Sequence, residues 1–290
     1  MALRPRPYRE LGDVAMQQSI PVDPELGRSI EEVKEVARFL WERGWAERNA
    51  GNISLDVTDR VPAAVEGLGR YPVTEIDQRY PGLSGCAFLV SGAGTRMRDL
   101  AREPAENACI LRIGEGSSSY HRLWGGEGEA CFRPTSELAS HLRIHQSLRE
   151  RQAPERAVVH THPNELIALT QAAEYGTEAA INRVLWAMLP EVKIFLPEGV
   201  GLVPYQRPGS EELARATMEA LGEHKVVLWE KHGCLAIGAG ALEAFDLIDT
   251  VNKSAQIFLA CKNAGLTPEG LTAAQLEELD KFFTQREKEE

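Results

Sequence analysis

Paired cysteines, long apolar runs and an excess of basic charge are all missing from this chain, and each absence excludes a class of protein. The five cysteines among 290 residues are odd in number, lie far apart and form no CxxC pair. Neither a disulfide framework nor a cysteine zinc site is therefore expected. No stretch approaches the roughly 18 apolar residues of a membrane span, and residues 1–25 lack the apolar core of a secretion signal. We expect a cytoplasmic protein.

Acidic residues outnumber basic ones by 43 to 32, which leaves a formal net charge of −11. This excess opposes a general affinity for nucleic-acid phosphates or anionic lipid, so we expect neither nucleic acid nor membrane as a partner. An anionic substrate would need its own local pocket. The 43% of hydrophobic residues suffice to bury a large core, as in an ordinary globular protein.

No internal repeat or long linker divides the sequence, so we predict a single domain over residues 1–290. Within it, residues 1–28 form an N-terminal extension and residues 265–290 a C-terminal helix and tail. Residues 59–85 mix proline, glycine and charge and predict a long loop. Ser29, with Glu32 three positions later, predicts a capped first helix over residues 29–47.

Strands and helices are expected to alternate irregularly along the rest of the chain. Short β-like runs predict strands at 53–57, 86–91, 108–113, 157–161, 200–203, 225–229 and 234–237. Helical patterns cover 136–150, 164–172, 177–189, 210–221, 241–264 and 271–285. Because several strands follow one another without a helix between them, an α/β fold with a mixed or largely antiparallel sheet covered by helices is favoured.

The strongest chemical signal is AVVHTHPNE, in which a short strand contains His160 and leads directly to His162. Side chains two positions apart on a strand leave the same face, so both imidazoles could bind one metal ion. His232 lies in a turn between two apolar strand runs and is the candidate third ligand. For each histidine taken alone, a hydrogen-bonded structural role is the alternative.

A rival pair of histidines lies one helical turn apart on the predicted helix 136–150. His141 and His145 could chelate a metal ion from one helical face. The same helix carries leucines at core spacing, so a packed helix with a polar flank is the simpler interpretation.

Glu137 follows Thr135 and Ser136 in the first turn of the predicted helix 136–150. Unpaired N–H groups and two hydroxyls at such a position can bind an anion beside a general base. A plain helix cap with a favourable acidic residue is the alternative.

Two glycine-containing loops suggest the same kind of pocket, because glycine lets backbone N–H groups approach an anion. In ERNAGNIS the side-chain amides add donors, and VSGAGT ends a predicted strand. The candidate residues of these loops are Asn49, Asn52, Gly92, Ala93 and Gly94. Neither loop is a P-loop, and each taken singly is most often a turn.

Taken together and in this order, ERNAGNIS, VSGAGT, PTSE, HTHP and KHG resemble the class II aldolase/adducin family over about residues 30–260. Longer stretches such as HPNELIALT and FDLIDTVNKSAQI strengthen the resemblance. It implies a three-layer α/β/α domain around a mainly antiparallel sheet, and a homotetramer with active sites at subunit interfaces. It also implies a lyase that reversibly cleaves a sugar phosphate, with one Zn²⁺ per subunit stabilising an enediolate.

Carried over by motif, the resemblance implies zinc ligands at His160, His162 and His232 and a catalytic carboxylate at Glu137. It implies contacts with the substrate phosphate or its neighbouring oxygens at the remaining motif positions, which are Asn49, Asn52, Gly92, Ala93, Gly94, Thr135 and Ser136.

A second acidic residue of the family is matched by Glu191, which the resemblance places in the adjoining subunit's site to handle the aldehyde half of the substrate. The sequence departs from the family here, because Pro190 precedes this residue and the flanking residues differ. It departs again at Ala93, where related enzymes often carry a serine hydroxyl.

Three alternatives stay open. The same scaffold and chemistry can serve another sugar-phosphate aldolase, a 4-epimerase or a thioribulose-phosphate dehydratase. An adducin-like binding module without chemistry is a second alternative, against which the three histidines and Glu137 argue. The third is a closed structural zinc site in which Glu137 supplies the fourth ligand.

Overall fold

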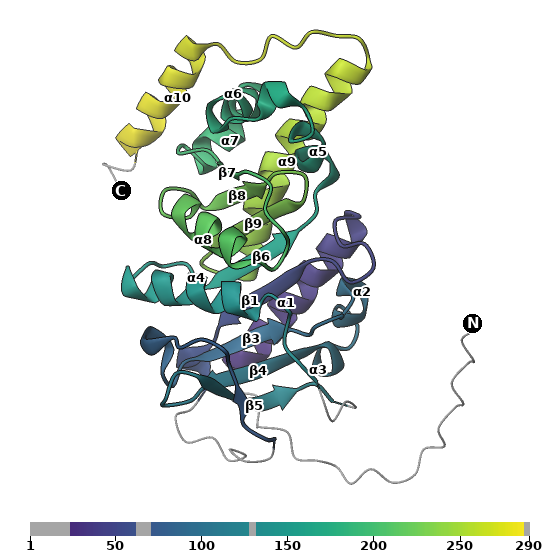
Figure 1. Cartoon of the computed structure of the whole chain (residues 1–290). Helices are drawn as coiled ribbons and strands as arrows, with labels where there is room; N and C mark the ends of the chain where they lie inside the picture. The colour runs from purple at the N-terminus through teal and green to yellow at the C-terminus, as the bar shows by residue number, and fades with distance from the viewer. Residues whose placement is uncertain (1–23, 62–70, 128–131, 287–290) are drawn as a thin grey trace, which may run out of the picture.

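The computed structural model of the chain describes residues 24–61, 71–127 and 132–286. Within them, nine strands form one sheet in the order β2-β5-β4-β3-β1-β6-β9-β8-β7 (Figure 1). Every neighbouring pair is antiparallel except β7 and β8, which are parallel. The predicted α/β fold with a mainly antiparallel sheet is confirmed.

The strands are β1 Asn52–Asp56, β2 Thr74–Glu75, β3 Ala87–Ser91, β4 Ala108–Ile113, β5 Ser119–Gly125, β6 Ala157–Thr161, β7 Gly201–Val203, β8 Val226–Trp229 and β9 Gly233–Gly238. The helices are α1 Pro24–Glu42, α2 Met97–Leu100, α3 Pro104–Asn107, α4 Leu138–Glu150, α5 Asn164–Leu169, α6 Glu178–Met188, α7 Pro190–Phe195, α8 Glu211–Ala220, α9 Ala241–Asn263 and α10 Ala273–Arg286.

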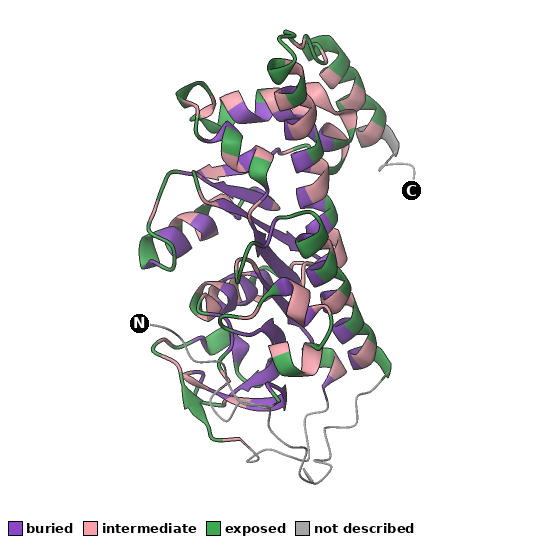
Figure 2. Ribbon diagram, turned by 90° about the vertical axis from the view of Figure 1, so that its right-hand side faces the viewer, coloured by how far each residue is buried: buried purple, intermediate pink, exposed green. Residues whose placement is uncertain are grey.

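Helices cover both faces of the sheet, because successive strand residues point to opposite faces and both sets are buried. Leu40 of α1 and Ile248 of α9 belong to one apolar cluster with Ile53 of β1. Ile144 of α4 packs with Val158 of β6 in a separate cluster on the opposite face. Figure 2 shows the buried strands running through the middle of the molecule, with exposed residues on the outer sides of the helices. The fold therefore has three layers, with the sheet between two layers of helices.

Several expectations about the elements need correction. Helix α1 extends back to Pro24, into the predicted N-terminal extension, whose residues 1–23 lie outside the described part of the chain, and it ends at Glu42 instead of residue 47. Ser29 is therefore not a cap: it is fully buried within the helix, and its hydroxyl donates to the carbonyl of Glu25 at 3.0 Å.

The sequence patterns also missed β5, α7 and the short helix α3. Strand β5 contains His121 and Arg122, polar residues that weaken a β pattern, yet it pairs along its length with β4. The predicted helix 177–189 ends at Met188, and Pro190 opens the separate helix α7. Residues 74 and 75 of the predicted loop form the short edge strand β2.

No helix of the described residues is both long and apolar enough to cross a membrane. Four of the five cysteines lie in this part of the chain and all four are free thiols, as the sequence predicts.

The pairing of the central strands places polar groups on the face that α4 covers. Asn52 pairs with His160, and Ser54 pairs with Val158. Directly paired residues share a face of the sheet, so these two polar side chains of β1 lie on the same side as the His160 ring.

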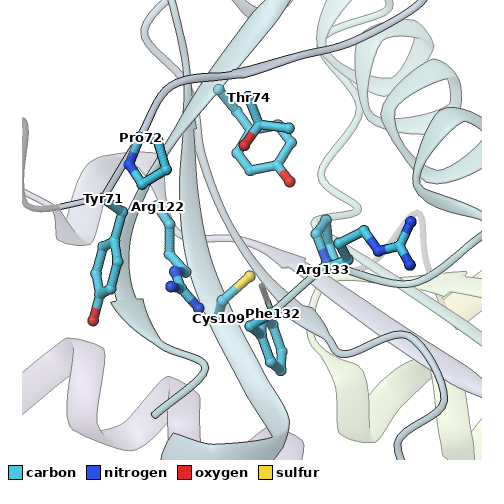
Figure 3. A pocket seen from close by; sticks show the side chains of 9 residues that line it. Tyr71, Pro72, Thr74, Cys109, Arg122, Phe132 and Arg133 are labelled. Carbon is cyan, nitrogen blue, oxygen red and sulfur yellow. The ribbon is translucent and has the colours of Figure 1, made fainter. Parts of the chain in front are cut away.

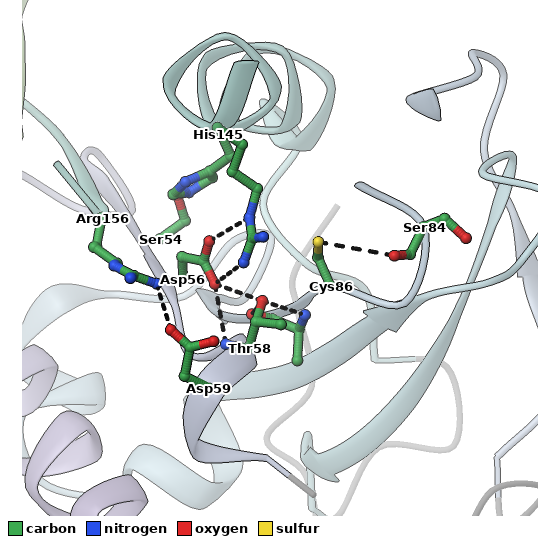
Figure 4. A network of polar contacts seen from close by, with 10 residues as sticks. Ser54, Asp56, Thr58, Asp59, Ser84, Cys86, His145 and Arg156 are labelled. Atoms are coloured by element: carbon green, nitrogen blue, oxygen red, sulfur yellow. Dashed lines mark hydrogen bonds and ion pairs between the residues drawn. The ribbon is translucent and has the colours of Figure 1, made fainter. Parts of the chain in front are cut away.

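An ion pair between the buried Asp56 and the partly exposed Arg149 fixes the C-terminal end of α4 to β1 (Figure 4). The carboxylate of Asp56 accepts hydrogen bonds from Arg149 Nε at 2.8 Å and from the Thr58 hydroxyl at 2.6 Å. Burial alone would raise the pKa of Asp56, but the hydrogen bonds from Arg149 and Thr58 outweigh it and lower the pKa. The carboxylate is therefore ionised at neutral pH.

We expect Asp56→Asn to lower the free energy of unfolding by about 2 kcal/mol at pH 7, because Arg149 loses its charged partner. A lowered carboxyl pKa stabilises the folded state above the unfolded-state pKa, and this stabilisation is lost as the pH falls through the folded-state pKa. The difference from the wild type should therefore shrink below about pH 4. Urea unfolding at several pH values measures it.

The control is Asp59→Asn, which breaks the exposed pair between Asp59 and Arg156 and should cost about 0.5 kcal/mol or less. Equal losses in the two variants, or a loss for Asp56→Asn that persists at low pH, would contradict the assignment.

Candidate active site

Three histidines converge at one end of β6. His160 lies on β6, His162 follows it directly, and His232 lies in the turn between β8 and β9. The ring centroids are 5.1, 5.1 and 5.2 Å apart, and one ring nitrogen from each residue lies within 4.8 Å of the others. A Cβ atom at Gly233 would come within 2.5 Å of the Thr161 carbonyl oxygen, so only glycine lets this turn approach β6 closely.

The hydrogen bonds around these rings leave nitrogen lone pairs free. His160 Nδ1 donates to the carbonyl oxygen of Cys234 at 2.8 Å, and His162 Nδ1 lies 2.8 Å from Glu47 Oε1. Each ring therefore keeps its Nε2 lone pair, an arrangement that orients metal-binding histidines. His232 Nδ1 is buried and has no hydrogen-bond partner among the described residues.

Burial and the neighbouring rings keep two of the imidazoles uncharged. Burial lowers the pKa of His160 well below its ordinary value, and the rings of His162 and His232 add to this shift. Burial also lowers the pKa of His232, followed by the effect of His162. Neutral imidazoles are the form that binds metal ions. Three imidazole donors fit a divalent ion with an open coordination position.

Glu137 lies directly before α4 and is half-buried. Its Oε2 accepts a hydrogen bond from Asn52 Nδ2 at 2.8 Å, and its backbone N–H donates to the Thr135 hydroxyl at 3.3 Å. The carboxylate is thereby held at the start of a helix, where the unpaired N–H groups favour negative charge.

The histidines and Glu137 line a single small cavity of about 140 Å³. It gathers nearly every candidate residue of the sequence motifs, and its lining consists of Asn49, Ala50, Gly51, Asn52, Gly92, Ala93, Gly94, Thr135, Ser136, Glu137, His160, His162 and His232. Segments far apart in the sequence thus meet at one polar site.

The turn formed by residues 92–94 offers an anion fewer free N–H groups than its sequence suggests. The amides of Gly92 and Ala93 donate to the carbonyls of Asn107 and Arg133, each at 2.9 Å. These two N–H groups therefore already have acceptors within the protein, and anion binding by the turn stays a prediction. The amide of Gly94, a residue with φ of 74°, donates to none of the described residues.

Other donors of the cavity come from the remaining motifs. Ser136 and Asn49 are exposed, so their side chains are accessible to a ligand. Thr135 is buried, and its hydroxyl oxygen accepts a hydrogen bond from the backbone N–H of Glu137.

Two further cavities adjoin the candidate cavity on the side of Ser136. One, of about 410 Å³, shares Ala93, Thr135 and Ser136 with the candidate cavity. The next, of about 470 Å³, shares Arg133 with it and also contains Arg122 (Figure 3). The 410 Å³ cavity beyond Ser136 is therefore lined by charges of both signs, Arg133 together with Glu75 and Asp77.

The rival histidine pair is not available to a metal ion. Both nitrogens of His141 are hydrogen-bonded, Nδ1 to the Ser54 hydroxyl at 2.6 Å and Nε2 to Asn52 Oδ1. His145 Nε2 lies 2.8 Å from the same hydroxyl. Helical spacing predicted the histidine pair, whereas Ser54 and Glu47 were not predicted as site residues. Both lie at the ends of ERNAGNIS, and Ser54 follows Asn52 by two positions on the same strand.

Glu191 does not line the candidate cavity of its own chain. It is exposed, in the first turn of α7, with Pro190 as the first residue of that helix.

Comparisons with known proteins place the chain in a family. The family described as class II aldolase and adducin N-terminal domain matches residues 31–259, and the chain belongs to it. The fold and these relationships make the protein a lyase of the class II aldolase type. The alternative of a non-catalytic binding module is thereby rejected.

Individual relatives agree over most of the length. The chain is 42% identical over 263 residues to the rhamnulose-1-phosphate aldolase of Bacteroides thetaiotaomicron, covering 90% of this chain and 96% of the relative. It is 36% identical to the rhamnulose-1-phosphate aldolase of Listeria welshimeri, covering 79% and 82%. The crystal structure of a sugar-phosphate aldolase from Thermotoga maritima matches with a TM-score of 0.72 and 33% identity, covering 85% of this chain and 100% of that one.

We expect the purified protein to bind about one divalent metal ion per chain, as three-histidine sites do. His232→Ala should lose most of this metal, because two imidazoles remain in place of three. Elemental analysis after dialysis against zinc measures the metal content, and circular dichroism checks that the variant folds.

The matched control is His224→Ala, which removes a buried histidine that interacts with Gly199 and Glu178. It should keep the full metal content. Retention of metal by His232→Ala, or an equal loss in both variants, would refute the ligand set.

Proposed function

We propose that the protein is a zinc-dependent aldolase that reversibly cleaves L-rhamnulose 1-phosphate to dihydroxyacetone phosphate and L-lactaldehyde. The observation that carries this proposal is the Glu137 carboxylate in one cavity with three converging imidazoles. Similarity to rhamnulose-1-phosphate aldolases over nine tenths of the chain supports the choice of substrate.

The metal site would make the carbon–carbon bond cleavable. His160, His162 and His232 would hold the ion, and the open position would face the cavity. When bound, zinc supplies a Lewis acid that polarises the substrate carbonyl and stabilises negative charge next to it.

Glu137 would move the proton at C3 of the substrate. In cleavage, the proton leaves the C4 hydroxyl, the C3–C4 bond breaks with its electron pair left next to the carbonyl, and C3 then takes a proton. Glu137 would return that proton, and in synthesis it would remove it from dihydroxyacetone phosphate. Asn52 holds Oε2, which leaves Oε1 for the transfer.

The phosphate would bind away from the histidines, on the Ser136 side of the cavity. The amide of Gly94, the hydroxyl of Ser136 and the amide of Asn49 would donate to it. The cation nearest to this side in the adjoining cavity is Arg133, which shares that cavity with Glu75 and Asp77. Fixing both ends of the substrate converts binding energy into orientation. This arrangement explains how an acidic chain binds an anionic ligand.

Glu191 would act in a neighbouring subunit's site, where it or a bound water would exchange the proton of the aldehyde oxygen. Its exposure on α7, outside the cavity of its own chain, supports this role. The proposal includes a homotetramer with sites at subunit interfaces and a cytoplasmic location.

The test is a coupled assay for dihydroxyacetone phosphate released from L-rhamnulose 1-phosphate, with L-fuculose 1-phosphate as the competing substrate. We expect release from the first to be faster, abolished by a chelator and restored by zinc. The proposal would be contradicted if folded, zinc-loaded protein released no dihydroxyacetone phosphate, or if release stayed at its full rate after metal removal.

Glu137→Gln should keep the zinc and lower kcat by a factor of about 10² to 10⁴, since it removes the proton-transferring carboxylate. The control is Glu150→Gln at the exposed far end of the same helix, which should match the wild type. Full activity of Glu137→Gln would show that another group moves the proton.

A further inference from the structure

A continuous line of hydrogen bonds runs from Glu137 into the core beneath the candidate site. Asn52 Nδ2 lies 2.8 Å from Glu137 Oε2, and Asn52 Oδ1 contacts His141 Nε2. His141 Nδ1 lies 2.6 Å from the Ser54 hydroxyl, and that hydroxyl lies 2.8 Å from His145 Nε2. Asn52, His141, Ser54 and His145 form what we call the Glu137 network.

Hydrogen-bond chemistry gives this network a single direction. Asn52 donates through its NH₂ group to Glu137 Oε2, so its amide oxygen faces His141. Asn52 Oδ1 accepts a hydrogen bond from His141 Nε2–H. In a neutral imidazole the other nitrogen, Nδ1, carries no proton, so it accepts the hydrogen bond of the Ser54 hydroxyl. Ser54 in turn accepts from His145 Nε2–H. Every proton then has one acceptor, with both rings protonated at Nε2.

Both histidines are neutral, as this direction requires. Burial lowers the pKa of His141 to about 3, although the negative charge of Glu137 partly opposes the shift. Burial likewise lowers the pKa of His145 to about 4. Their side chains and Ser54 are almost completely buried, so breaking one bond leaves a polar group without a partner.

The backbone holds the network from two sides. Asn52 and Ser54 are two positions apart on β1 and therefore share a face. Glu137, His141 and His145 follow at four-residue intervals and therefore share one face of the α4 segment. Figure 4 shows Ser54 and His145 close to the Asp56 network that ties α4 to β1.

We propose that the Glu137 network orients the Glu137 carboxylate for proton transfer at C3 of the substrate, with Asn52, Ser54, His141 and His145 as positioning residues. The proposal rests on the proposed function and extends it to Ser54, His141 and His145, which do not line the candidate cavity. Asn52 fixes Oε2, and the buried residues fix which way the Asn52 amide faces.

The test measures exchange of the C3 proton of dihydroxyacetone phosphate with D₂O, followed by proton NMR without any aldehyde. Ser54→Ala removes the hydroxyl that links the two histidines. We expect the exchange kcat to fall about tenfold or more, with KM within about twofold and the metal content unchanged.

The matched control is Ser254→Ala, which removes another buried hydroxyl, bonded to the Leu185 carbonyl in α6, away from the network. It should leave the exchange rate unchanged. Exchange at the wild-type rate in Ser54→Ala, or the same loss in Ser254→Ala, would overturn the proposal.

A second pair of variants decides the question if Ser54→Ala does not fold. In His145→Gln, the side-chain amide nitrogen can donate to the Ser54 hydroxyl in place of Nε2. In His145→Met, the side chain has no donor. We expect exchange to be retained in the first and lowered in the second, and equal rates would overturn the proposal. Failure of the proposed function is distinct, because it abolishes exchange already in the zinc-loaded wild type.

Discussion

The pairing of β1 with β6 is the constraint on which the rest of the site depends. It sets Asn52 opposite His160, so the residue that holds the Glu137 carboxylate lies beside a ring of the candidate metal centre. A slip of one residue would turn each of these side chains to the other face of the sheet. The pairing of β6 with β9 then brings the turn that carries His232 to the same place.

The polar side chains of β1, which are Asn52, Ser54 and Asp56, all lie on one face of the sheet. The opposite face, with Ile53 and Val159, packs against α1 and α9 in an apolar cluster. On the α4 face, Ser54 and His160 are buried but hydrogen-bonded, which offsets the cost of removing them from water. The largest apolar cluster thus lies on the side of α1 and α9, whereas the candidate site lies on the α4 side. On that second side, the ion pair between Asp56 and Arg149 ties α4 to β1.

The sequence predicted those parts of the site that depend on local geometry. The two-residue spacing of His160 and His162 on a strand, and the position of Glu137 at a helix start, are fixed by the backbone within a few residues. The partners of these groups depend on tertiary contacts. Nothing near Ser54 in the sequence shows that it meets two histidines of a distant helix. The acceptors that occupy the amides of Gly92 and Ala93 were equally hidden.

The same distinction explains the errors in the fold. A serine followed by a glutamate predicted a cap at Ser29, but the amphipathic pattern continues upstream and burial of the helix face overrides the local signal. Strand β5 forms because β4 offers a long edge, whereas its own polar residues give little β signal.

The central claim is that one ion, one substrate and Glu137 meet in a single cavity. Anomalous diffraction at the zinc edge, from crystals soaked with zinc and dihydroxyacetone phosphate, tests it directly. The account predicts a metal peak bound by His160, His162 and His232, with the phosphate on the Ser136 side and Glu137 beside C3. A peak elsewhere, or Glu137 as a fourth metal ligand with the substrate excluded, would contradict it.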